Sequence, residues 1–288
     1  MANTLKVMYP EWQSGMNPNY VLGAKIMDLV VPNSQAMEEV KIPVATKNQH
    51  DLLERFNDVD AAKVLQAQIR TFTGILDTKQ PDKVVTIGGD CAVSLSPFSY
   101  LSEKYGDDLG IIWLDAHPDI STTDQSHHLH EMVVSSLMGK GAPDFNIKYP
   151  VLKDQILLAG LVKESLRPMD GHVKDYGMCF LTPEQLKDDS TLIKDWIKGN
   201  HFTKIAIHLD LDVLSPDDYR SIYPAEPGLN RDRFSSAIGK LSLKEVGLIL
   251  KQIDEESDLV GLTIAENMSW DSLRLQKQLK TLSLFNCK

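Results

Sequence analysis

The chain has 288 residues, of which 42% are hydrophobic and 24% are charged, proportions that are usual for a soluble globular protein. Its net charge of −10 argues against a protein that binds nucleic acid irrespective of sequence, because such proteins carry excess positive charge. The same acidic balance is compatible with a cationic small-molecule substrate.

In the first half of the chain, short β-branched or apolar runs alternate with stretches of helical periodicity. The predicted strands are Leu5–Tyr9, Lys83–Ile87 and Leu109–Leu114. Helices are predicted over residues 48–78, in two arms that meet near residues 58–60, over residues 91–105 and over residues 131–138.

The alternation continues in the second half. The predicted strands are Ile156–Ala159, Met178–Leu181, Lys204–Leu211 and Leu259–Ala265. Helices are predicted over residues 183–198, 232–240 and 243–255, and a final helix runs to about residue 284. Strands that alternate with helices predict a parallel sheet covered on both faces, and we expect residues 1–288 to form one α/β domain.

The run Ile111–Asp119 places Asp115, His117 and Asp119 at spacing i, i+2, i+4. In an extended chain, alternate side chains lie on one face, so these three converge if the strand conformation persists. Two carboxylates on one face repel each other unless a cation joins them. The stretch therefore predicts a metal site.

Other predicted strands also end in polar residues. Asp210 and Asp212 repeat the i, i+2 spacing, Cys91 follows a Gly-Gly-Asp turn, and Glu266 follows the last strand. Ligands of parallel sheets bind beyond the carboxyl ends of the strands, which is where these side chains are expected. Buried carboxylates without a cation are costly, so the metal interpretation is favoured over turn formation or helix capping.

The expected cellular compartment follows from sequence signals that the chain lacks. Met1–Tyr9 lacks the basic and apolar regions of a signal peptide, and no apolar run approaches the ~20 residues that cross a bilayer. The three cysteines, Cys91, Cys179 and Cys287, are scattered and odd in number, which argues against a disulfide framework. We expect a cytoplasmic protein without a membrane partner.

Five motifs, in order between about residues 84 and 270, resemble those of the arginase/agmatinase (ureohydrolase) family. They are Gly-Gly-Asp-Cys, Asp-Ala-His-Pro-Asp, His-Glu-Met, Asp-Leu-Asp-Val-Leu-Ser-Pro and Gly-Leu-Thr-Ile-Ala-Glu. The resemblance implies an arginase-like three-layer α/β/α fold with a mainly parallel sheet of about eight strands. It also implies two Mn²⁺ ions that share a hydroxide, a small guanidino or amidine substrate, hydrolysis of its C–N bond, and a homo-oligomer.

Five residues match metal-ligand positions of the family, namely Asp115, His117, Asp119, Asp210 and Asp212. Cys91 departs from the pattern, because it stands where the family usually has a histidine ligand. One ion would be held by Asp115, His117, Asp210 and Asp212. The other would depend on Cys91, Asp115, Asp119 and Asp210.

Three roles are open for Cys91. It can bind metal as a thiolate, helped by a helix N-terminus, which would shift the preference from Mn²⁺ toward Zn²⁺, Fe²⁺ or Co²⁺. It can stay a neutral thiol beside a weak or absent second ion. It can also act as a nucleophile on an amidine carbon, which is less favoured because five other ligand positions are retained.

By resemblance, His130 is the proton shuttle and Glu266 pairs with the substrate guanidinium. His208 has the parity of Asp210 and Asp212 on its strand, and we expect it to be a core histidine or one that supports the ligands. Ser126 matches a serine that contacts the amino-acid end of arginine in arginases, and Ser121 stands where an asparagine would be. Glu226 is a candidate for a cationic tail, with solvation slightly favoured.

The substrate stays open among arginine, agmatine, formiminoglutamate and guanidino acids. Two further hypotheses compete with the two-metal amidinohydrolase. One is an arginase-like fold with a single metal that hydrolyses an amide. The other is a catalytically weak family member that binds a metabolite or a partner. Hydrolysis is favoured because His130, Glu266 and five ligand positions are all retained.

Overall fold

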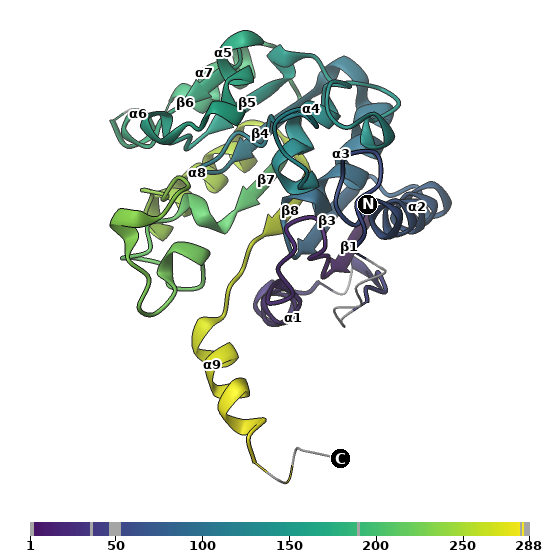
Figure 1. Ribbon diagram of the computed structural model, residues 1–288. Helices are drawn as coiled ribbons and strands as arrows, with labels where there is room; N and C mark the ends of the chain where they lie inside the picture. Colours follow the sequence, from purple (N-terminus) through teal and green to yellow (C-terminus); the bar gives the residue numbers. More distant parts are fainter. Residues whose placement is uncertain (1–2, 35–36, 46–52, 189–190, 283, 285–288) are drawn as a thin grey trace.

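The computed structural model describes residues 3–34, 37–45, 53–188, 191–282 and 284, and its strands form one parallel sheet (Figure 1). The order of the eight strands is β2-β1-β3-β8-β7-β4-β5-β6. Their bounds are β1 (Thr4–Tyr9), β2 (Met37–Lys41), β3 (Lys83–Gly88), β4 (Leu109–Leu114), β5 (Ile156–Ala159), β6 (Cys179–Leu181), β7 (Lys204–Asp210) and β8 (Asp258–Ala265). The predicted parallel sheet of about eight strands is confirmed, and β2 is the strand that the sequence patterns did not indicate.

Helices cover both faces of this sheet (Figure 1). They are α1 (Tyr20–Val30), α2 (Ala62–Lys79), α3 (Leu95–Tyr105), α4 (Val133–Leu137), α5 (His172–Asp175), α6 (Pro183–Asp188), α7 (Leu192–Gly199), α8 (Leu243–Glu256) and α9 (Trp270–Leu279). None of the helices in the described part of the chain has both the length and the apolar character that crossing a bilayer requires.

Strand β4 shows how the three layers form. Its residues Ile111 and Trp113 pack in a core with apolar side chains of α2, α3 and α4. The alternate residues Ile112 and Leu114 belong to a second core, with side chains of α7 and α8. Because successive side chains of a strand point to opposite faces, a wholly apolar strand needs helices on both sides. The three-layer α/β/α prediction is confirmed.

The predicted helical arm before α2 is wrong for the residues that the structure describes. Residues 53–61 form bends and turns, with an antiparallel bridge between Phe56 and Val59. The backbone φ angles of Asn57 and Asp58 are +48° and +62°, which a helix does not allow. Residues 48–52 of that prediction lie outside the described residues.

The predicted helix over residues 232–240 is also wrong. Only Arg231–Arg233 make a 3₁₀ turn, and Leu241 then pairs with Leu214 in a parallel bridge. Between them the chain is pressed against the loop after β7, since a Cβ on Gly239 would lie 2.0 Å from the carbonyl oxygen of Asp212. A helix would not fit in that space. Within the helix predicted over residues 183–198 the structure describes α6 and α7, and residues 189–190 between them lie outside the described residues.

Candidate metal centre

Four neighbouring strands bring the predicted site residues together. Strands β3, β8, β7 and β4 lie side by side in the middle of the sheet. At or just beyond their carboxyl ends stand Cys91, Glu266, Asp210 and Asp115 respectively. A cavity of about 660 Å³ lies at this edge, and its lining includes Cys91, Asp210 and Glu266. This is where a parallel α/β sheet is expected to bind its ligand.

The first cluster of possible metal ligands consists of Asp115, His117 and Asp212, whose ligand atoms lie within 4.8 Å of one another. The Nδ1 atom of His117 is 3.4 Å from Oδ1 of Asp115 and 3.1 Å from Oδ2 of Asp212. Its Nε2 atom lies 2.7 Å from the hydroxyl of Ser236. The far side of the ring is thus anchored, and Nδ1 faces the two carboxylates.

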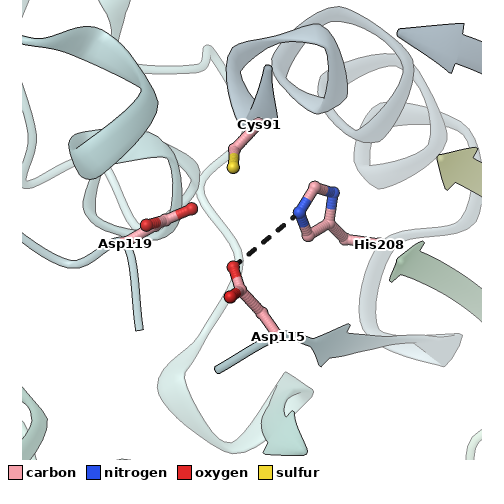
Figure 2. A group of neighbouring side chains, drawn as sticks. All are labelled: Cys91, Asp115, Asp119 and His208. Carbon is pink, nitrogen blue, oxygen red and sulfur yellow. Dashed lines mark ion pairs between the residues drawn. The ribbon is translucent and has the colours of Figure 1, made fainter. Parts of the chain in front are cut away.

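A second cluster contains Cys91, Asp115, Asp119 and His208, all buried (Figure 2). Cys91 also belongs to a third set, with Asp210 and Glu266. Its thiol donates to Oδ2 of Asp210 over 3.1 Å, and Sγ lies 3.5 Å from Oε1 of Glu266. The thiol therefore lies among the carboxylates at the floor of the cavity.

Asp119 lies beside Asp115 for a different reason from the one that the i, i+4 spacing suggests. Strand β4 ends at Leu114, and the backbone of Asp119 has a φ angle of +43°. The side chain joins the cluster because the chain turns, not because an extended strand continues. This left-handed conformation is strained for a residue other than glycine, as is often found at functional sites.

The carboxylates are held in an environment that disfavours their charge. Burial, followed by the Asp212 carboxylate, raises the pKa of Asp115 to about 6. The same two causes raise the pKa of Glu266 to about 7. Burial and the charge of Asp115 raise the pKa of Asp119, and burial and the charge of Asp212 raise that of Asp210. Several buried acids with raised pKa values in one cavity indicate a site built for a cation.

Within the acidic clusters that the structure describes, two buried carboxylate oxygens have no hydrogen-bond partner, Oδ2 of Asp119 and Oδ1 of Asp212. Unpartnered buried oxygens are unfavourable unless something else satisfies them. Carboxylates together with an imidazole suit a divalent metal ion. The donors present therefore fit the metal that the sequence motifs imply.

The neighbouring charges make a free thiolate at Cys91 unfavourable. Burial raises the pKa of the Cys91 thiol, and the carboxylates of Asp119 and Asp210 raise it further. The residue begins a 3₁₀ turn, Cys91–Ser94, before α3, and this helix end does not offset the carboxylates. A nucleophilic role needs the thiolate, so this environment argues against it. A bound cation would reverse the balance by compensating the negative charge.

His130 and Glu266 both line the cavity. The Nδ1–H group of His130 donates to the carbonyl oxygen of Ser14 over 3.0 Å, and because a carbonyl only accepts, the proton must lie on Nδ1. The backbone N–H of Glu266 donates to the carbonyl of Gly89, and its carboxylate accepts from the hydroxyl of Tyr20. Both side chains are thus oriented by neighbours outside the acidic clusters.

The three residues predicted to contact the substrate differ in whether they line the cavity. Glu226 lines the cavity, but Ser121 and Ser126 are not among its lining residues. The hydroxyl of Ser121 is fully buried and donates to the carbonyl of Met169 over 3.3 Å. The hydroxyl of Ser126 donates to Oε2 of Glu131 over 2.5 Å. Both hydroxyls are thus hydrogen-bonded within the protein, and contact of either serine with a substrate stays a prediction.

Several lining residues were not found from the sequence. They include Arg167, Ser236 and the aromatic group Tyr223, Phe234 and Trp270. The Tyr223 ring centroid lies 5.7 Å from that of Phe234 and 5.9 Å from that of Trp270. All five come from loops or a helix start without a recognisable motif, so no spacing rule indicated them.

Comparison with known proteins decides the family. The arginase family model matches residues 23–266, which is most of the chain. The chain belongs to the arginase family. An arginase from Staphylococcus aureus is 22% identical over 229 residues, which cover 73% of this chain and 72% of that protein. Family membership makes the protein a hydrolase that acts on carbon–nitrogen bonds, and it confirms the family resemblance of the motifs.

Solved structures of family members share the fold. The arginase from Bacillus subtilis superposes with a TM-score of 0.71 at 16% identity, and 99% of each chain is covered. The formimidoylglutamase from Bacillus subtilis superposes with a TM-score of 0.67 at 15% identity, covering 93% of this chain and 80% of that one. At such identities the likeness establishes the fold alone, and two differently named activities occur on it.

Proposed function

We propose that this member of the arginase family is a metal-dependent hydrolase that cleaves a C–N bond in the guanidino or amidine group of a small linear substrate. The observation that carries the proposal is that two clusters of possible metal ligands, Asp115 with His117 and Asp212, and Cys91 with Asp210 and Glu266, contribute side chains to one cavity of about 660 Å³. Such a hydrolysis needs carboxylates that bind metal ions and a histidine that transfers a proton, and His130 lines the same cavity.

The donors can be divided between two ions. Asp115, His117, Asp210 and Asp212 would hold the first ion, and Cys91, Asp115, Asp119 and Asp210 would contribute to the second. When bound, divalent ions supply Lewis acidity, which lets water attack a poorly electrophilic carbon near neutral pH. Mn²⁺ is the metal implied by the resemblance, and the sulfur of Cys91 favours Zn²⁺, Fe²⁺ or Co²⁺.

Glu266 would bind the head of the substrate. A guanidinium or amidinium group presents two parallel N–H bonds, and a carboxylate accepts both in a bidentate pair. A hydrogen bond from the Tyr20 hydroxyl favours the charged form of the Glu266 carboxylate. Burial and Asp212 raise the pKa of Glu266 to about 7, so the protein compensates its negative charge poorly, and a cationic head group would compensate it.

His130 would protonate the leaving amine. With its proton on Nδ1 held by the carbonyl of Ser14, the second nitrogen, Nε2, is the one left for proton exchange in the cavity. Protonation at Nε2 gives an imidazolium that can donate this proton to a departing nitrogen. Glu266 and His130 thus divide the binding and the proton transfer between them.

The test is a hydrolysis screen on protein stripped of metal and reloaded with Mn²⁺, Zn²⁺, Co²⁺ or Fe²⁺. Urea and ammonia release are measured with arginine, agmatine, guanidinobutyrate and formiminoglutamate, and bound metal is counted in parallel. We expect metal-dependent turnover of at least one of these substrates. Metal-loaded protein that hydrolyses none of them would contradict the proposal and favour a binding role.

A matched pair of variants shows whether turnover comes from this cavity. We expect Glu266→Gln to lower kcat/KM at least about 100-fold, because a neutral amide cannot form the charged bidentate pair. Glu164→Gln is the control, since Glu164 pairs with Lys240 at the surface and lies outside the cavity lining. It should keep the rate of the unchanged protein.

A further inference from the structure

His208 lies deeper in the sheet than the residues of the metal motifs. It stands on β7 two residues before Asp210, so the two side chains point to the same face. The side chain is fully buried, and its ring stacks on the indole of Trp113 with centroids 3.7 Å apart and an interplanar angle of 19°. An imidazole is long enough to reach from this depth toward the edge of the sheet.

One edge of the His208 ring is fixed by hydroxyl groups. Its Nδ1 atom lies 2.8 Å from Oγ of Ser94 and 3.0 Å from Oγ1 of Thr263. These two hydroxyls are 2.7 Å from each other. Hydrogen bonding at one ring nitrogen is how proteins orient a histidine whose other nitrogen binds a metal.

The other edge of the ring has no such partner. In the described part of the chain, Nε2 of His208 is buried without a hydrogen bond, and Oδ2 of Asp115 is 4.0 Å away. A buried nitrogen left unpaired costs about 1–3 kcal/mol. Oδ2 of Asp115 is already hydrogen-bonded to the indole N–H of Trp113 over 3.1 Å. The neutral ring therefore presents Nε2 to the acidic cluster without a protein partner.

Around this nitrogen are three further possible ligands. His208, Cys91, Asp115 and Asp119 each offer an atom within 4.8 Å of the other three, close to the span of two ligand–metal bonds of about 2.0–2.3 Å. Figure 2 shows the four side chains directed toward a common space, from β7, from the turn before α3 and from the loop after β4. The unpartnered Oδ2 of Asp119 is a second buried atom in the same space.

We propose that His208 is a direct metal ligand, which completes with Cys91, Asp115 and Asp119 a site of one nitrogen, one sulfur and two carboxylates. The inference rests on the proposed function, because it concerns the second of the two ions. His208 would supply from β7 the imidazole that the family resemblance leads one to expect at position 91. Four donors with sulfur and nitrogen among them suit Zn²⁺, Co²⁺ or Fe²⁺ better than Mn²⁺.

The competing explanation is that His208 only supports its neighbours by packing. Equilibrium dialysis of the metal-free full-length chain against Zn²⁺ and Mn²⁺, with bound metal counted, separates the two. We expect His208→Asn to weaken the binding of one zinc ion by more than about 100-fold, since loss of a merely supporting contact costs about 10–100-fold. His172→Asn, a change at a histidine that stacks on Tyr176 outside the cavity lining, is the control and should bind as the unchanged protein does.

Repeating the substitution in a Cys91→His chain separates the loss of a metal ligand from a general destabilisation of the protein. In a Cys91→His chain the imidazole is restored at position 91, so adding His208→Asn should cost less than about 10-fold in zinc affinity. Equal losses in both backgrounds would overturn the proposal and leave His208 a packing residue. Unchanged zinc binding by His208→Asn would overturn it as well. An unchanged chain that binds no divalent ion at all would instead contradict the proposed function.

X-ray absorption spectroscopy of the unchanged, fully zinc-loaded protein tests the proposal without any variant. If His208 is a ligand, two imidazoles are expected per two zinc ions, one from His117 and one from His208, with one sulfur from Cys91. One imidazole per two zinc ions would overturn the proposal. Cobalt-loaded protein should in addition show a thiolate-to-metal charge-transfer band, which Cys91→His removes.

Discussion

At the scale of the residue, the proposed function gives the two nitrogens of His130 separate roles. Nδ1 donates to Ser14, and the ring borders the cavity without belonging to a metal cluster. We predict that His130→Asn lowers kcat by about 100- to 10,000-fold, the usual contribution of a general acid. Metal content should stay unchanged, which dialysis measures alongside the rate. If the variant loses metal together with activity, His130 is a ligand or a structural residue instead.

Single residues also show what the sequence could and could not reveal about the site. Asp115, His117, Asp210 and Asp212 stand at regular spacing at or just after the ends of apolar strands, and this pattern is sufficient to predict that they lie at the same edge of the sheet. His208 has the same parity, but only coordinates reveal that its Nε2 lacks a partner while Nδ1 is hydrogen-bonded. Arg167 and Ser236 reach the cavity from irregular loops, and no periodicity governs where a loop places a side chain.

At the scale of the element, helix α1 packs tightly against the segment that follows β8. A Cβ added to Gly23 of α1 would lie 1.6 Å from the carbonyl oxygen of Asn267, the residue after Glu266. That oxygen is backbone and cannot yield without moving Glu266 or the helix. We predict that Gly23→Ala lowers the free energy of unfolding by at least about 1–3 kcal/mol, as overpacking usually does, and lowers kcat/KM as well.

The control is Gly247→Ala in α8, where an added Cβ meets no atom within 4 Å. Alanine is the better helix former by about 1 kcal/mol, so this change should be neutral or stabilising and leave activity unaltered. Denaturant melts and steady-state rates check both variants. Equal effects of the two substitutions would show that α1 does not position Glu266.

The elements that were predicted correctly and those that were not differ in what determines them. Strands β3, β4 and β7 are buried on both faces, and their apolar runs were sufficient to find them. Strand β2 has no buried residue and pairs only with β1, so its sequence carries little pattern. The non-helical course of residues 234–240 is imposed by contact with the loop after β7, which is a tertiary effect.

At the scale of the whole molecule, the sheet gathers residues from positions 91 to 266 into one buried acidic site, and this should make stability depend on pH. Burial and Asp212 raise the pKa of Glu266 to about 7, and Asp212 and Asp115 raise the pKa of His117 well above its usual value although burial opposes this. Groups with raised pKa values hold protons more tightly in the folded state than in the unfolded state. Their stabilising contribution is therefore lost as the pH rises through the folded-state pKa.

We predict that the metal-free protein melts at a lower temperature near pH 8 than near pH 6.5, because each unit of raised pKa is worth about 1.4 kcal/mol. The comparison starts at pH 6.5 because burial lowers the pKa of His208 to about 3. A lowered histidine pKa makes stability rise with pH, but only below about pH 6.5, the pKa of an unperturbed histidine. A divalent ion binds ionised carboxylates, so the gain in melting temperature on adding Zn²⁺ should be larger near pH 8. Calorimetry with and without metal at both pH values measures the two effects. A metal-free chain that is more stable near pH 8 would mean that the acidic cluster is already compensated by the protein itself, and the need for a cation at this edge of the sheet would disappear.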